Sequence, residues 1–355
     1  MERQAYTDFD EFADSLSGVA GRFVPTARSS GEWWIERAHA GRIDLQHVQV
    51  GGATTFAGDG VPDHLMIAIP IADSESIRID GQPLAVDIYA LVINNQPFTC
   101  SSRQLTRWAT MTIPLERLNG NAPQLLSPVA GGTRNQAKQA VLEQLRSLTL
   151  RLCSDQQTIN IVESAASAAV EEEIFHAVIA ALDASSRATD RHIGRPQVSR
   201  TRVIARCLEL IDASEGQPLF IDDLCSATQV SERTLRNIFQ EYFGVGPMRL
   251  LKVRQLREIR SALLKGDAVA DTVTKIAARF GVWDFSLFAR NYRALYGEAP
   301  SQTLRRPRSS PAERRDDETL SPTWIGYASR RFTFGPPLQT TEGAEADAEP
   351  GTTGL

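Results

Sequence analysis

The chain has 355 residues, 42% of them hydrophobic, and its 38 Lys and Arg against 43 Asp and Glu give a net charge of −5. Its apolar runs fall short of the ~20 residues of a membrane-spanning helix, and its charged first residues lack the apolar core of a signal peptide. A membrane-spanning protein and a secreted protein are therefore not expected. The length favours two domains, and four cysteines without a CxxC pair favour reduced thiols in the cytoplasm.

The charge is divided unevenly along the chain. Residues 1–196 carry 16 basic and 23 acidic side chains, residues 197–308 carry 18 and 12, and residues 309–355 carry 4 and 8. A basic block inside an acidic chain is typical of a polyanion-binding module that is attached to a second domain.

The first part of the chain is predicted to be rich in β-strands. Short runs with β-branched residues and partial alternation occur at 42–50, 64–72, 76–81, 87–94 and 105–114. Turn signals rich in Gly and Pro separate these runs. This pattern favours an antiparallel β-barrel or jelly roll over residues 1–132.

Residues 133–190 change to helical periodicity. Apolar residues at steps of three and four predict one amphipathic helix over 134–152 and a second over 159–182. The pair either forms a dimer interface or braces the barrel. A polar linker over residues 185–200 then separates the acidic part of the chain from the basic block.

The basic block, residues 197–308, contains the same helical pattern twice. Apolar residues in the first copy recur in the second at an offset of 53 positions. Leu235, Phe239 and Phe243 thus match Phe288, Tyr292 and Tyr296. The two copies end in FGVGP and YGEAP. Each copy predicts a short helix, a turn and a longer helix, at 221–228 and 232–243 in the first and at 273–280 and 285–296 in the second. This is the layout of a helix-turn-helix unit.

Capping residues mark the ends of these helices. Ser231, Thr272 and Asp284 are suitable N-caps, and Gly244 and Gly297 are suitable C-terminal stops. The segment 247–266 between the units predicts a connecting helix of about 19 residues, which spans roughly 28 Å at 1.5 Å per residue. That length is close to the ~34 Å repeat of B-DNA, so the two units are expected to reach successive major grooves.

Residues 202–306 resemble the AraC/XylS family of bacterial transcription regulators. The resemblance rests on Asp223-Leu224-Cys225, on VSERTLRNIFQEYFGVGPMRLL and on VTKIAARFGVWDFSLFARNYRALYGEAPSQTLR. It implies an all-α domain that binds double-stranded DNA, and the strand-rich N-terminal part resembles the cupin-like sensing domain of many such regulators. The expected fold is therefore α+β and multidomain, with the β-barrel and its two helices preceding a double helix-turn-helix domain.

Two positions depart from the family pattern. Gln229 occupies the first turn, where the family usually has Gly, and a non-Gly residue with positive φ costs on the order of 1 kcal/mol. Phe220 precedes the first helix, where a Ser or Thr cap is usual, and such a cap contributes ~1 kcal/mol. The first unit is therefore expected to be the less stable one.

The resemblance also indicates which side chains meet DNA. In the first recognition helix the candidates are Arg233, Thr234, Arg236 and Asn237, since Arg pairs with guanine and Asn with adenine in the major groove. The alternative for each of these residues is a solvated helix face. On the connecting helix, Arg249 and Lys252 are the candidate phosphate contacts.

The second recognition helix offers fewer hydrogen-bonding groups. Only Ser286 and Arg290 provide them, while Phe285 either touches a thymine methyl group or packs against Trp283. The second unit is therefore expected to position the protein on DNA more than to read sequence.

Candidate effector contacts lie on the predicted strands. Core packing is the ordinary role of Trp34, Met66 and Trp108, but the interior of a sensing barrel is also where an apolar effector would bind, and His47 and His64 would add polar groups. No HxH motif occurs, so neither a catalytic metal site nor a cofactor is expected.

Together these features predict a cytoplasmic, non-enzymatic transcription regulator. Its expected partners are promoter DNA, an unknown small-molecule effector and a second copy of the chain, with RNA polymerase as a further candidate and no membrane. One alternative is a cupin-fold, metal-dependent enzyme with a DNA-binding appendage, and another is a constitutive DNA-binding dimer without an effector. The acidic segment 309–355 is predicted to be a largely disordered tail.

Overall fold

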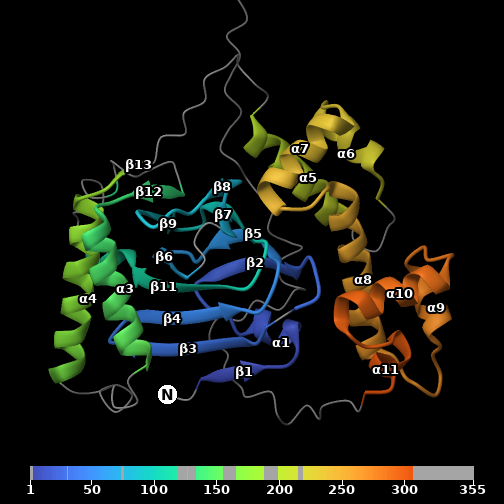
Figure 1. Ribbon diagram of the computed structural model, residues 1–355, viewed down its shortest axis with the longest axis horizontal. Helices are drawn as coiled ribbons and strands as arrows, with labels where there is room; N and C mark the ends of the chain where they lie inside the picture. Colours follow the sequence, from blue (N-terminus) through green and yellow to red (C-terminus); the bar gives the residue numbers. More distant parts are fainter. Residues whose placement is uncertain are drawn as a thin grey trace, which may run out of the picture.

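The computed structural model describes residues 3–29, 31–72, 76–118, 126, 133–154, 165–187, 199–214 and 219–306. The predicted tail and most of the polar linker lie outside these residues. A β-rich N-terminal part is covered on one side by α3 (Gln139–Ser154) and α4 (Ala165–Asp183), and the C-terminal helices lie on its other side (Figure 1).

Two antiparallel sheets form the N-terminal part, and all their strand pairs within the described residues run antiparallel. The larger sheet has the order β1 (Gln4–Tyr6), β3 (Trp33–Ala40), β4 (Ile43–Val50), β11 (Thr106–Pro114), β6 (His64–Ala72), β9 (Ile88–Ile93), β12 (Arg134–Gln136) and β13 (Ser186–Arg187). The smaller sheet has the order β2 (Val19–Pro25), β5 (Thr54–Gly60), β10 (Pro97–Ser102), β7 (Ile77–Ile79) and β8 (Gln82–Pro83). The antiparallel β-rich prediction is confirmed.

Some boundaries differ from the sequence prediction. Residues 134–136, which were expected to begin the first helix, instead pair with Ile88–Ala90 of β9, so α3 begins only at Gln139. The helical periodicity of this segment therefore starts after an edge strand. The beginning of the second predicted helix, 159–164, lies outside the described residues.

Both faces of the larger sheet are buried. Along β4, Ile43 and Leu45 belong to the core shared with α3 and α4, whereas Val48 and Val50 belong to the core between the two sheets. Alternate residues of one strand therefore serve two different cores. This arrangement decides which side chains can face a ligand between the sheets.

A short N-terminal helix, α1 (Phe9–Asp14), closes one end of the inter-sheet core. The Asp8 carboxylate caps it by accepting a hydrogen bond from the Asp10 backbone N–H at 2.8 Å. Phe12 is fully buried, and its ring centroid lies 5.0 Å from that of Trp33. The cap and this aromatic contact fix α1 against the sheets.

The C-terminal part is all-α and matches the predicted double helix-turn-helix. Its helices are α5 (Arg200–Ala213), α6 (Ile221–Thr228), α7 (Glu232–Phe243), α8 (Pro247–Lys265), α9 (Val273–Arg279), α10 (Phe285–Tyr296) and α11 (Pro300–Leu304). The first unit, α6 and α7, packs around Leu235 and Phe239, and the second, α9 and α10, around Phe288 and Tyr292. The helix α8 supplies apolar residues to both cores.

The predicted helix signals are present. Ser231, Thr272 and Asp284 each accept a hydrogen bond from a backbone N–H of the helix they precede. Gln229 has a φ of 55°, so the expected left-handed conformation at the first turn is confirmed.

Phe220 gives no side-chain cap, but the Asp223 carboxylate accepts from the Phe220 N–H at 2.8 Å. This contact satisfies the backbone N–H of Phe220. The first N–H groups of α6 still lack a side-chain acceptor from the N-cap residue. Of the helices that the structure describes, none combines the length and the apolar character needed to cross a bilayer.

Candidate nucleic-acid interface and ligand cavity

The N-terminal half of α7 presents polar side chains to solvent. Arg233, Thr234, Arg236 and Asn237 are all exposed, while the core side of the helix carries the buried Leu235. Arg236 pairs with Glu232 one turn earlier, and a base contact by Arg236 requires this exposed pair to open. The pair costs little to break because solvent-exposed ion pairs contribute only about 0–1 kcal/mol.

The matching part of α10 is different. Ser286 and Arg290 are exposed as expected, but three large apolar side chains stand beside them in solvent. Trp283 is 86% exposed, Phe285 36% and Leu287 42%. Neither the Trp283 nor the Phe285 side chain is part of the hydrophobic core of the second unit.

The two recognition helices lie at opposite ends of α8 (Figure 1). Its 19 residues correspond to about 28 Å of helix. A rigid helix of this length, packed into both cores, fixes the spacing between the exposed starts of α7 and α10.

One face of α8 contacts the N-terminal part. Arg249 donates to the carbonyl oxygen of Thr26, with Nη2 at 2.9 Å, and Arg257 donates to the carbonyl oxygen of Phe23. Arg249, a predicted phosphate contact, is therefore engaged by the residue that follows β2 in this arrangement. The sequence could not show this contact, because Arg249 and Thr26 are far apart along the chain.

Lys252 lies on a different side of α8. It is half-buried, and its Nζ donates to Gln255 Oε1 at 2.9 Å. Burial lowers the pKa of Lys252, while the nearby Asp284 carboxylate opposes that shift. Lys252 therefore lies near the start of α10, which Asp284 caps.

A buried ion cluster links α8 to the start of α1 and to the loop after α10. Arg260 is 4% exposed and pairs with Asp8, with Glu298 at 2.5 Å and with Asp10 at 3.6 Å. Its guanidinium carbon lies 4.5 Å from the ring centre of Tyr296. Burial opposes ionisation of Asp8, but the Arg260 charge holds the pKa of that carboxyl below its ordinary value. Arg260 therefore joins α1, α8 and the loop after α10.

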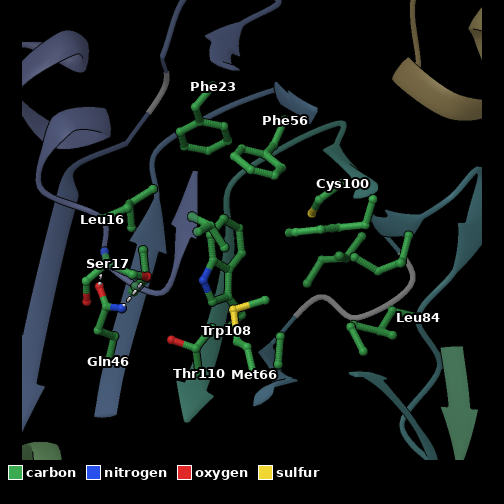
Figure 2. Close-up of a pocket in the computed structure, with 17 residues that line it drawn as sticks. Leu16, Ser17, Phe23, Gln46, Phe56, Met66, Leu84, Cys100, Trp108 and Thr110 are labelled. Carbon is green, nitrogen blue, oxygen red and sulfur yellow. Dashed lines mark hydrogen bonds between the residues drawn. The ribbon is translucent and has the colours of Figure 1, made fainter. Parts of the chain in front are cut away.

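A cavity of about 70 Å³ lies between the two sheets (Figure 2). Its lining comprises Leu16, Ser17, Val19, Phe23, Gln46, Val48, Phe56, Met66, Ala68, Ile77, Ile79, Leu84, Ala90, Phe98, Cys100, Trp108 and Thr110. None of these side chains is charged. Burial raises the pKa of the Cys100 thiol to about 12, so this group is also neutral at physiological pH.

The largest polar group of the lining is already satisfied. Gln46 Nε2 donates to the carbonyl oxygen of Ser17 at 2.8 Å, and the Ser17 N–H donates to Gln46 Oε1 at 3.2 Å (Figure 2). This reciprocal pair ties the segment after α1 to β4. It leaves the cavity with little free hydrogen-bonding capacity.

The predicted effector residues separate into two groups. Met66 and Trp108 line the cavity, whereas Trp34 and His47 project from the other face of the sheet. His47 Nδ1 lies 2.8 Å from Glu36 Oε2, and its ring packs edge-on against Trp34 at 4.8 Å. Burial lowers the pKa of His47 despite the neighbouring Glu36. These two residues thus belong to a buried polar cluster rather than to the cavity.

His64 is also outside the cavity. It starts β6, where its Nδ1 lies 2.7 Å from the carbonyl oxygen of Pro62. The cavity residues Phe23, Phe56 and Phe98 had not been predicted, because β2, β5 and β10 were not recognised as separate strands. The available signal was the short apolar runs between Gly- and Pro-containing turns.

The family comparison matches the C-terminal part of the chain. Residues 224–306 match the family described as a helix-turn-helix domain. The chain is 32% identical over 110 residues to the probable thc operon regulatory protein of Rhodococcus erythropolis, which covers 31% of this chain and 33% of that protein. It is also 32% identical over 100 residues to the XylDLEGF operon transcriptional activator of Pseudomonas putida, covering 28% of this chain and 31% of that protein.

The C-terminal part of the chain therefore contains a helix-turn-helix domain of the AraC/XylS type. The crystal structure of a probable AraC family transcriptional regulator from Rhodopseudomonas palustris is 33% identical, covers 30% of this chain and 99% of that one, and has a TM-score of 0.28. The matched segment spans about a third of the length of the two curated AraC/XylS relatives. The likeness to the family thus lies in the double helix-turn-helix, and the β-rich part is described by its own structure.

Proposed function

We propose that this protein is a transcription regulator that reads two adjacent major grooves of double-stranded DNA. The observation that carries the proposal is the pair of helix-turn-helix units with exposed recognition helices at the two ends of α8. Such helices enter the major groove with their N-terminal residues. The basic charge of residues 197–308 favours the same partner.

In this proposal Arg233, Arg236 and Asn237 read base edges in one half-site, with Thr234 at the groove wall. Arg and Asn provide the bidentate contacts that distinguish guanine and adenine. Their exposure supports this role.

The remaining predicted contacts are assigned to the backbone. Ser286 and Arg290 of α10 contact the phosphates of the second half-site, and Lys252 also contacts phosphate. Arg249 joins them only in an arrangement where it has left the carbonyl oxygen of Thr26. Homodimer formation and contact with RNA polymerase stay predictions.

The test is selection of bound duplexes from a random pool by the full-length chain. The expected result is a site of two half-sites whose centres lie about one helical turn, 10–10.5 base pairs, apart. The double variant Arg233→Ala/Arg236→Ala should lose the sequence preference of one half-site only. Arg42→Ala is the matched control, because it removes an exposed Arg of the β-rich part that pairs with Glu116. Equal binding of wild type to all sequences would refute the proposal.

We further propose that the inter-sheet cavity binds a small, neutral and largely apolar effector. The support is the uncharged lining, together with the two hydrogen bonds by which Ser17 and Gln46 satisfy each other. A carboxylate placed there would lose its hydration without a cationic partner, which is strongly unfavourable. Because ligand sites usually measure about 300–1,000 Å³, the sheets are expected to separate or side chains to move when the effector binds.

This second proposal is tested with matched pairs of ligands in a thermal shift assay. Neutral aromatic compounds should raise the melting temperature, whereas the corresponding aromatic carboxylates should not. Ala68→Leu adds apolar volume to the lining and should abolish the shift. His64→Ala is the control, since His64 lies outside the cavity. Equal stabilisation by the carboxylates would contradict a neutral effector.

A further inference from the structure

The start of α10 exposes more apolar surface than the fold requires. Trp283, Phe285 and Leu287, here called the apolar tip, are all exposed, and Trp283 is 86% exposed although tryptophan is on average a highly buried residue. The other large hydrophobic side chains of the second unit are buried or partly buried. The apolar tip is therefore a local feature of the surface at which a recognition helix meets DNA.

The tip lies outside the hydrophobic core of the second helix-turn-helix unit. The core contacts of α10 come from Phe288 and Tyr292, and Val282 provides the buried residue of the turn. Asp284 provides the N-cap by accepting from the Leu287 N–H at 2.8 Å. These roles account for the core of the unit, so the exposed surface of the tip is available for an intermolecular contact.

The surroundings of the tip favour a polyanion as the partner. Residues 272–306 contain six Lys and Arg against two acidic residues. At 100° per residue, Ser286 and Arg290 point farthest from the buried Phe288, and Phe285 and Leu287 flank Ser286. Apolar side chains thus border a cationic line along the helix, and Lys252 lies near the start of the same helix.

We propose that the apolar tip reads thymines through their C5-methyl groups. In the major groove the thymine methyl group is the apolar element of the base-pair code, and apolar side chains recognise it by direct contact. The second unit then specifies sequence without hydrogen bonds to base edges, and it selects a thymine-containing half-site. This inference rests on the proposed DNA-binding function and assigns the specificity of its second unit.

The exposed Ala289 is consistent with such an approach. Ala289 lies one helical turn after Phe285, and its small side chain allows the helix axis to lie close to the base pairs. Arg290, on the adjacent position, can then reach the phosphates beside the same bases. The expected contacts therefore combine an apolar base contact with a charged backbone contact.

The test uses the full-length chain and a duplex site obtained by selection from a random pool. Each thymine of the half-site bound by α10 is replaced in turn by deoxyuridine, which lacks the C5-methyl group but keeps the same hydrogen-bonding groups. Binding by wild type should weaken about four-fold for each methyl group that contacts the tip. This factor corresponds to losing the burial of one apolar carbon, about 0.8 kcal/mol. Uracil in the half-site bound by α7 should have little effect.

Variants then connect the effect to the tip. Phe285→Ala and Leu287→Ala should weaken binding to the thymine-containing site. Each variant should then bind the thymine-containing and the uracil-containing sites with equal affinity. Val269→Ala is the matched control, because Val269 is a 96% exposed apolar side chain outside the tip. It should retain the full difference between thymine and uracil. Circular dichroism establishes that each variant is folded.

The outcomes separate this inference from the proposal on which it rests. Sequence-specific binding with no uracil effect in either half-site would overturn thymine reading and leave the DNA-binding proposal intact. If the tip variants kept their DNA affinity and the uracil effect but no longer bound a partner protein, the tip would be a protein-docking surface. That result would also overturn thymine reading. Absence of any sequence-specific binding would overturn both.

Discussion

The two helix-turn-helix units share two fully buried core positions of their recognition helices and differ at the exposed ones. Leu235 and Phe239 of the first unit correspond to Phe288 and Tyr292 of the second, and all four side chains are buried. The starts of the recognition helices carry Arg side chains in the first unit and an apolar tip in the second. The comparison teaches that the fold is specified by the core spacing, which leaves the exposed helix starts free to differ.

The units also differ in how they contact the β-rich part. The first unit lies against the smaller sheet, where a Cβ on Gly81 would be 2.9 Å from the Tyr242 ring. The second unit is connected through the buried Arg260 to Asp8 and Glu298. Close packing thus holds the first unit, and a charged cluster holds the second.

The largest expected effect comes from removing the charge that holds the second unit. Arg260→Ala leaves the mostly buried Asp8 and Glu298 carboxylates without their main partner and should lower the free energy of unfolding by about 3–5 kcal/mol. Urea denaturation of the full-length chain measures this loss. Arg306→Ala is the control, because Arg306 pairs with the same carboxylates but is 46% exposed, and its loss should cost less than about 1 kcal/mol. Equal losses would show that burial of Arg260 is unimportant.

The next effect concerns DNA reading by the first unit. Arg236→Ala should reduce discrimination at one base pair of its half-site by about 1–3 kcal/mol, since a bidentate Arg–guanine contact is lost. Arg290→Ala should instead weaken binding to all sequences and reduce the salt dependence. Titrations against single-base variants of the site, at several salt concentrations, measure both. If Arg290→Ala removes base preference and Arg236→Ala does not, the roles of these two residues are reversed.

A smaller effect is expected from exchanging the turn residues of the two units. Gln229→Gly should raise the free energy of unfolding by up to about 1 kcal/mol, because Gln229 has a φ of 55° and glycine tolerates that conformation. The lost hydrogen bond from Gln229 Nε2 to the Ser226 carbonyl oxygen offsets part of this gain. Gly281→Gln should cost a similar amount through its φ of 74° alone, since a Cβ there meets no atom within 4 Å. Thermal melts give both signs, and a clear drop for Gln229→Gly would contradict the strain argument.

The helix caps are expected to have an effect of the same size or smaller. Thr272→Ala removes the acceptor for the Lys275 N–H and should cost about 1 kcal/mol, whereas Phe220→Ser provides the missing cap and should gain about half as much. Phe220 is 61% exposed, so its replacement removes little packing. Denaturation midpoints of the two variants should move in opposite directions. A loss of stability in Phe220→Ser would show that this side chain has a packing role.

The helices of the C-terminal part were predictable because their signals are local. Caps such as Ser231 and stops such as Gly244 lie within one turn of the helix ends they define, and α6, α7, α8 and α10 have the predicted bounds to within a residue. The contacts between α8 and the β-rich part were not predictable. Arg260 and Asp8 are 252 positions apart, and no periodic pattern connects them.

The cavity was only partly predictable for a different reason. Hydrophobic alternation identifies the buried face of a strand when the other face is solvated. In the larger sheet α3 and α4 cover the second face, so Trp34 and His47 are as buried as their neighbours. Met66 and Trp108 were correctly placed as interior residues, but the sequence held no signal for which of the two cores each strand residue would join.

Strand β2 has a consequence for the energetics of regulation. The Phe23 side chain lines the cavity, and the carbonyl oxygen of the same residue accepts the hydrogen bond from Arg257 of α8. A ligand that shifts Phe23 therefore acts on the helix that spaces the two recognition helices. Binding free energies that are coupled in this way are reciprocal, so DNA must change the affinity for the effector by the same factor by which the effector changes the affinity for DNA.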